Sequence, residues 1–170
     1  MQVIHFDTTS SRSELEWIRG INSYLPGDIR VLWSKEVSES FHARFSAISR
    51  SYQYKIYNDK IFSGLWTKRS LFVTQNLDIA LMQKASEYLL GEHDFSSFRG
   101  SGCQSKTAIR EVEDIKVIKK DQFIIIEIQA NAFLLHMVRI IVGTLLMVAK
   151  RELDRKSVVE GKSVDVGGRR

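Results

Sequence analysis

Gln122-Phe-Ile-Ile-Ile-Glu-Ile-Gln-Ala130 predicts a strand that lies inside a sheet. Its first half is apolar on both faces, as expected of a central strand that is covered on both sides. Residues 111–119 before it read as a second strand, and Lys120-Asp121 between the two predicts the turn of a hairpin. Phe133 to Lys150 follows as a long helix rich in Leu, Val, Ile and Met.

Upstream segments continue this mixture of strands and helices. Residues 47–57 alternate between faces, which predicts a strand. Three of its side chains share one face: Tyr52, Tyr54 and Ile56. A helix is expected through residues 79–90, with Asn76 or Asp78 as its N-cap and Gly91 as its stop.

The first 40 residues predict one helix between two strands. Residues 3–6 read as the end of a strand, and residues 29–37 as another. A helix is expected from about Ser13 to Tyr24, and its apolar positions repeat every three to four residues: Leu15, Ile18, Ile21 and Leu25. The whole pattern predicts an α+β fold, with a mostly antiparallel sheet and helices packed on one face.

Composition limits the classes of protein that fit. A chain of 170 residues can form one domain with a core, and with one proline and no Gly/Ser-rich linker we expect no flexible joint between domains. Cys103 stands alone, which excludes an internal disulfide and a cysteine-cluster metal site. The four histidines share no metal-ligand spacing, so we expect no metal. No signal peptide and no stretch of about 18 apolar residues is present, which favours a cytoplasmic protein without membrane spans.

Residues 154–170 differ in character from the rest. They have neither a helical nor a strand period, and they resemble the peptide read from a common sequencing-adapter oligonucleotide. We therefore expect residues 1–153 to form the folded part of the chain and residues 154–170 to be a non-native tail. The alternative is a disordered basic tail. This tail supplies two of the five net positive charges, so the charge is only a weak indication of a nucleic-acid partner.

Three segments could carry function. Residues 44–58 combine three tyrosines with Arg44, Arg50 and Lys55, which suits a strand that contacts RNA, or else a half-buried strand with solvated charges. Residues 91–107 are polar and aromatic. They form either a functional loop or a packed turn with Phe95 and Phe98 in the core.

The third segment places a single arginine in an apolar helix. Because burying an unpaired charge is costly, Arg139 should have an acidic partner or point into a cleft. Alternatively, its head reaches water while its stem packs against neighbours. His136 nearby is more typical of an ordinary core or surface histidine than of a catalytic base.

Taken in order, these segments resemble the TruA family of tRNA pseudouridine synthases. The matching pieces are Gln2-Val-Ile-His-Phe-Asp7, Leu25-Pro-Gly-Asp28-Ile, Phe41-His-Ala-Arg44-Phe-Ser46, Arg50-Ser-Tyr52-Gln-Tyr54, Leu90-Gly-Glu-His-Asp94-Phe95-Ser-Ser-Phe98, and Asn131-Ala-Phe133 through Met137-Val-Arg139. No piece is decisive alone, but the ordered set is specific and runs from Gln2 to about Ala149.

The resemblance implies an isomerase that converts uridine to pseudouridine in the anticodon arm of tRNA, as a homodimer and without metal or organic cofactor. Its nucleophilic aspartate belongs to an Arg-Thr-Asp-Ala-Gly-Val-His motif that these 170 residues do not contain. Tyr52 matches the tyrosine against the target uracil, and Arg139 the arginine that pairs with the aspartate. Arg44, and less closely Arg12, match positions that contact the tRNA backbone.

The resemblance also implies that residues 1–153 are a partial catalytic domain. Part of the family's sheet would precede Met1, so that Met1 is an internal methionine, and the tail would replace the family's last segment. Three hypotheses follow. The chain is a fragment of the enzyme that is inactive as given, a non-catalytic RNA-binding protein on the same scaffold, or an unfolded fragment.

Overall fold

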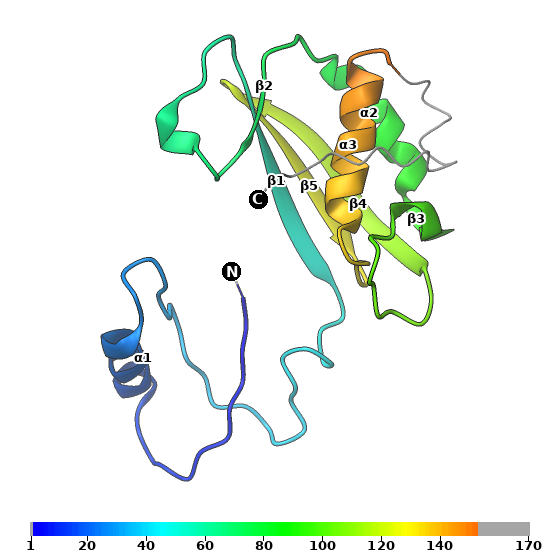
Figure 1. Ribbon diagram of the computed structural model, residues 1–170. Coiled ribbons are helices and arrows are strands. Elements are labelled where there is room, and N and C mark those ends of the chain that lie inside the picture. Colours follow the sequence, from blue (N-terminus) through cyan, green and yellow to red (C-terminus); the bar gives the residue numbers. More distant parts are fainter. Residues whose placement is uncertain (1, 153–170) are drawn as a thin grey trace. The chain divides into compact units, whose positions relative to one another are not determined.

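Residues 2–152 are described by a computed structural model, and the expected tail at 154–170 lies outside them (Figure 1). The chain divides into two compact units, with the boundary between Ala47 and Ile48. No proline or glycine lies near that boundary in the sequence, although serine occurs at 46, 49 and 51. Each unit is described by itself below.

A five-stranded sheet forms the second unit. Its strands are β1 (Arg50–Asn58), β2 (Leu71–Val73), β3 (Gly91–Asp94), β4 (Ile109–Lys120) and β5 (Phe123–Ala130). They are ordered β2-β1-β5-β4-β3, and all neighbours are antiparallel except the parallel pair of β1 and β2. The strand predicted at 122–130 is therefore central, and the predicted hairpin is β4 with β5.

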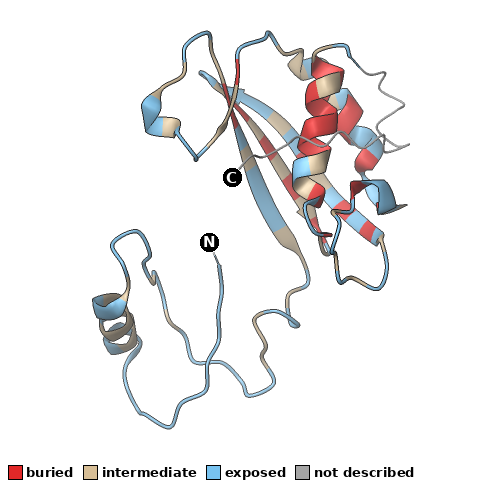
Figure 2. Ribbon diagram, viewed as in Figure 1, coloured by how far each residue is buried: buried red, intermediate tan, exposed pale blue. Residues whose placement is uncertain are grey.

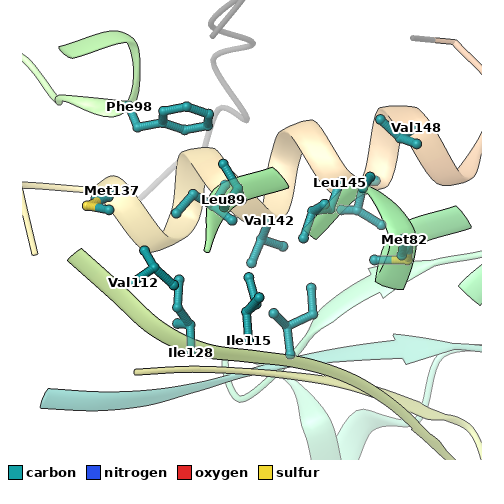
Figure 3. Close-up of a cluster of buried hydrophobic side chains, with 14 of the residues drawn as sticks. Met82, Leu89, Phe98, Val112, Ile115, Ile128, Met137, Val142, Leu145 and Val148 are labelled. Carbon is teal, nitrogen blue, oxygen red and sulfur yellow. The ribbon is translucent and has the colours of Figure 1, made fainter. Parts of the chain in front are cut away.

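The two faces of the sheet differ in what covers them. Along β5 every second residue is buried: Ile124, Ile126, Ile128 and Ala130. These residues face α2 (Ile79–Ser86) and α3 (Met137–Ala149), which pack on one another and contribute to the same core, as Figures 2 and 3 show. The predicted arrangement of helices on one face is thus confirmed for this unit.

Aromatic side chains gather where the opposite face of the sheet meets β2. Tyr57 and Phe123, which pair across β1 and β5, contact each other with ring centroids 5.2 Å apart. Phe62, Phe72 and Trp66 complete this cluster, and Trp66 belongs to a short 3-10 helix, η1 (Gly64–Trp66). The cluster anchors the otherwise irregular connection between β1 and β2.

Helix α2 begins where a side-chain cap fixes its first turn. Asp78, one of the two predicted caps, accepts a hydrogen bond from the Leu81 N–H at 3.0 Å. After α2 the chain tightens into the 3-10 helix η2 (Glu87–Leu89), so the predicted helical stretch ends close to residue 90 as expected.

Two boundaries in this unit were predicted wrongly. Helix α3 begins at Met137 instead of Phe133, because residues 131–136 form a connection that ends in a left-handed His136 with φ of 61°. The segment 91–94, read as a loop, is the edge strand β3, which pairs with β4. Gly91 has φ of +91°, a conformation that glycine adopts without strain, and this bends the chain from η2 into the strand.

The first unit contains the predicted helix but neither predicted strand. Helix α1 (Glu14–Tyr24) starts with a capping box in which Ser13 and Glu16 satisfy each other's backbone N–H groups. Residues 3–6 and 29–37 are not strands, because neither forms a backbone ladder with a neighbour. Instead, the Asn22 side chain bonds both backbone groups of Val31.

Candidate functional site

Tyr52 lies on the face of β1 that the helices pack against, at a position that they do not fully cover. Tyr52 points to the same face as Ile56, because side chains two or four residues apart share a face of a strand. Ile56 is fully buried, whereas the Tyr52 residue is 50% exposed. Its ring stands edge-on to Phe133, with centroids 5.1 Å apart and planes at 84°. Such an edge-to-face pair is a favourable aromatic arrangement and leaves ring surface open to a ligand.

The connection at residues 131–136 holds Phe133 in this position. The backbone N–H of Asn131 donates to the Glu111 carbonyl, and the Asn131 side-chain oxygen accepts from the Glu111 N–H. Arg50 donates to the Asn131 carbonyl at 3.2 Å, which ties the connection to the start of β1. Leu134 is buried behind it. Tyr52 therefore faces an ordered partner.

Arg139 follows in the first turn of α3 and is exposed. Within residues 2–152 its side chain makes no hydrogen bond and no ion pair. Of the two alternatives left open by the sequence, the structure agrees with the one in which the arginine head reaches water. A basic group thus stands in the first turn of the helix that follows Phe133.

The loop of residues 99–107 braces the same connection. Gly100 N–H donates to the Leu135 carbonyl at 2.8 Å, and Leu135 N–H donates to the Cys103 sulfur at 3.4 Å. This bond, with a second from the Ser105 backbone, lowers the pKa of the Cys103 thiol. Arg99 donates to the Cys103 and Ser105 carbonyls and fixes the shape of the loop.

The packed-turn reading of residues 91–107 is confirmed for its aromatic residues. Phe95 and Phe98 are 1% and 2% exposed, and they contact each other in and beside the 3-10 helix η3 (Ser96–Phe98). Asp94 accepts two bonds from Ser96, of which the hydroxyl bond is the larger cause of the lowered Asp94 pKa. The buried side chains of Phe95 and Phe98 thus fix the backbone from which the loop of residues 99–107 starts.

Arg110 was not singled out from the sequence. It is 9% exposed and donates to oxygens of Ser105 and Thr107, while its Nε has no partner within residues 2–152. A basic residue in a polar, alternating strand gives no sign of being buried, so only the packing of the loop over β4 could reveal it.

Arg12 and Arg44 lie in the first unit, whereas Tyr52 and Arg139 lie in the second. Arg12 stands beside the N-cap of α1, with its Cζ 5.5 Å from the Trp17 ring centroid. Arg44 is exposed on a turn, with its Cζ 5.7 Å from the Phe45 ring centroid. Both arginines thus rest on aromatic rings, a cation–π arrangement.

Within residues 2–152, no group of three or more His, Cys, Asp or Glu side chains is placed to hold a metal ion. No helix in the same range is long and apolar enough to cross a membrane.

Comparison with known proteins defines the class. The family model described as tRNA pseudouridine synthase matches residues 85–164, a stretch that includes α3 and the β4–β5 hairpin. The α+β architecture is consistent with that family. The chain is therefore similar to the tRNA pseudouridine synthase family.

The curated relatives that match the chain share one name, tRNA pseudouridine synthase A. The chain is 49% identical over 151 residues to tRNA pseudouridine synthase A of Coxiella burnetii (strain Dugway 5J108-111). The matched residues make up 89% of the chain and 58% of the relative. The chain is 50% identical over 163 residues to the protein of that name from Buchnera aphidicola subsp. Schizaphis graminum (91% and 62%). For Histophilus somni (strain 129Pt) the identity is 53% over 145 residues (85% and 54%). The chain thus spans less than two thirds of each of these relatives.

Proposed function

We propose that the protein to which this chain belongs converts uridine to pseudouridine in the anticodon arm of tRNA. The observation that carries this proposal is the half-exposed Tyr52 ring, held edge-on by Phe133, with Arg139 in the helix turn that follows. The relatives' shared name, tRNA pseudouridine synthase A, supports the same reaction.

The reaction is an isomerisation, so it needs no redox partner. The bond from the ribose to a ring nitrogen of uracil breaks, and a bond from the ribose to a ring carbon forms. The proton lost from that carbon is balanced by one gained at the nitrogen. A carboxylate nucleophile can hold the ribose between the two steps. We infer that Tyr52 stacks on the uracil once it has left the RNA stack.

Arg139 is proposed to pair with the nucleophilic aspartate. An arginine next to a carboxylate keeps it ionised and therefore nucleophilic. The Arg-Thr-Asp-Ala-Gly-Val-His motif that would supply this aspartate is not among the 170 residues. We therefore expect the chain as given to be inactive, and a polypeptide that adds the motif to be active.

Substrate binding is proposed to involve both units. Arg44 and Arg12 would contact phosphates of the tRNA backbone, which fix its orientation without reading its sequence. A homodimer would present two such surfaces to the tRNA, which sedimentation of the full-length protein tests directly. Because tRNA is the proposed substrate, we place the reaction in the cytoplasm.

The test compares binding with catalysis. We expect the chain to bind unmodified tRNA with an affinity that falls steeply with salt, and to form no pseudouridine. Fused behind a segment that carries the Arg-Thr-Asp-Ala-Gly-Val-His motif, it should become active. Tyr52→Ala and Arg139→Ala should remove that activity, while Tyr52→Phe, which keeps the ring, should retain binding.

Each outcome has one meaning. Pseudouridine formation by the chain alone would show that the missing motif is not required. A folded fusion that binds tRNA but stays inactive would favour the non-catalytic RNA-binding protein. Absence of tRNA binding at low salt, with a cooperative unfolding transition, would overturn the proposed function.

A further inference from the structure

The turn that carries Arg44 is closed by two residues, His42 and Ser46. The Ser46 N–H donates to the His42 carbonyl at 2.8 Å, and the His42 N–H donates to the Ser46 hydroxyl oxygen at 2.9 Å. This reciprocal pair makes a single helical turn that is not continued. Arg44 lies at its centre and is exposed.

The His42 side chain also bonds the inside of this turn. Its Nδ1 accepts the backbone N–H groups of Arg44 and Phe45, both at 3.2 Å. These donors lie two and three residues after His42, the spacing at which Ser, Asp or Asn caps a helix. An imidazole nitrogen accepts hydrogen bonds through its lone pair, so in this geometry Nδ1 is the acceptor for both N–H groups.

Aromatic contacts hold the imidazole in place. The His42 ring centroid is 4.3 Å from that of Phe45 and 4.3 Å from that of His5. His5 in turn accepts the Ala43 N–H through its own Nδ1 at 3.4 Å. Phe45 lies under the Arg44 guanidinium, so His42 contacts both the Arg44 backbone and the ring on which the Arg44 side chain rests.

We propose that His42 is a positioning residue that orders the Arg44 turn for contact with an RNA phosphate. This rests on the proposed function, because it takes Arg44 to contact tRNA. An exposed arginine loses conformational freedom when it binds, and a turn ordered in advance reduces that cost. His42 itself touches no substrate in this proposal and acts through the Arg44 and Phe45 amides.

The first readout needs no RNA. In the free 170-residue chain, His42→Ala should abolish the hydrogen-exchange protection of the Arg44 and Phe45 amides. His42→Asn should largely restore it, because an asparagine oxygen can accept the same N–H groups. Unchanged exchange at both amides in His42→Ala would overturn the proposed contact.

The second readout is affinity for unmodified tRNA at low salt. His42→Ala should weaken binding about 2- to 12-fold, the range expected when one flexible side chain must be ordered on binding. In an Arg44→Ala background the same change should have almost no effect, and His42→Asn should bind nearly as the unsubstituted chain does. A merely structural role would weaken both backgrounds equally and would overturn the proposal.

These outcomes separate the two proposals. If the unsubstituted chain binds tRNA but His42→Ala binds equally well, only the role of His42 is wrong. If the unsubstituted chain fails to bind tRNA, both are overturned, whatever the amide exchange shows.

Discussion

The two units of this chain are ordered by different means. Residues 48–152 contain every buried side chain of the described chain, including Ile126 and Leu145 at 0% exposure. Residues 2–47 contain none, and large apolar side chains such as Leu32 stay 74% exposed. The first unit depends on caps and side-chain bonds to its own backbone, and the second on packing. Comparable substitutions should therefore have very different effects in the two units.

Core truncation should give the largest difference. Leu145→Ala removes a fully buried side chain between α3 and the sheet and should cost about 2–5 kcal/mol of unfolding free energy. The matched change Leu32→Ala in the first unit should stay within about 0.5 kcal/mol. Denaturant unfolding followed by circular dichroism measures both. Equal effects would mean that the first unit has a core that this structure lacks.

Close packing of the loop of residues 99–107 can be tested with one methyl group. A Cβ at Gly100 would lie 2.9 Å from the Leu135 carbonyl oxygen and 2.9 Å from His136, so the loop or the connection must shift. Gly100→Ala should cost about 1–3 kcal/mol, typical of overpacking. Gly64→Ala, where nothing lies within 4 Å, is the control. A neutral Gly100→Ala would show that the loop is not docked.

Loss of the capping box should affect the first unit alone. Ser13→Ala removes the acceptor for the Glu16 N–H and should destabilise α1 by about 0.5–2 kcal/mol. Amide exchange across residues 14–24 should accelerate, while the denaturant midpoint of the second unit stays unchanged. Ser11→Ala, which touches no cap, is the comparison. A shifted midpoint would indicate that the two units unfold together.

The smallest effect concerns Cys103. Because hydrogen bonds from Leu135 and Ser105 favour its thiolate, the pKa of the thiol lies below the usual value. Alkylation by iodoacetamide should therefore reach its plateau rate at lower pH in the folded chain than in the same chain in denaturant. The sign follows from linkage: a lowered pKa stabilises the folded state increasingly as pH rises through the thiol's range. Identical pH profiles would contradict the Leu135 contact.

Local signals in the sequence predicted local structure well. The apolar repeat that follows Ser13, Asp78 before an apolar helix, and the turn at Lys120-Asp121 each define an element from neighbouring residues, and all three elements are present. Apolar content alone was misleading at 3–6 and 29–37, because a strand also needs a partner backbone. The short strand β2 exists only through its pairing with β1 and has no local signal.

The site follows the same rule. Alternation placed Tyr52 on the face of Ile56, but its contact with Phe133 joins residues far apart in the chain and requires the β1–β5 register. The sequence left open whether Arg139 is exposed, because helical periodicity does not show which residues of a helix are covered by neighbouring elements. The roles of Tyr52, Arg44 and Arg12 in tRNA binding, and of Arg139 beside the nucleophilic aspartate, stay predictions.

The β1–β5 register has a consequence for synthesis of the protein. Strand β1 pairs with β5 from Tyr57–Phe123 to Arg50–Ala130, whereas β4 and β5 are joined by a tight turn. At about 5–20 residues per second, β1 leaves the ribosome roughly 3–16 s before its antiparallel neighbour exists. During that interval a tyrosine-rich strand has open edges, the condition that favours aggregation. Yield from expression should therefore depend on translation speed and on chaperones that cover this strand.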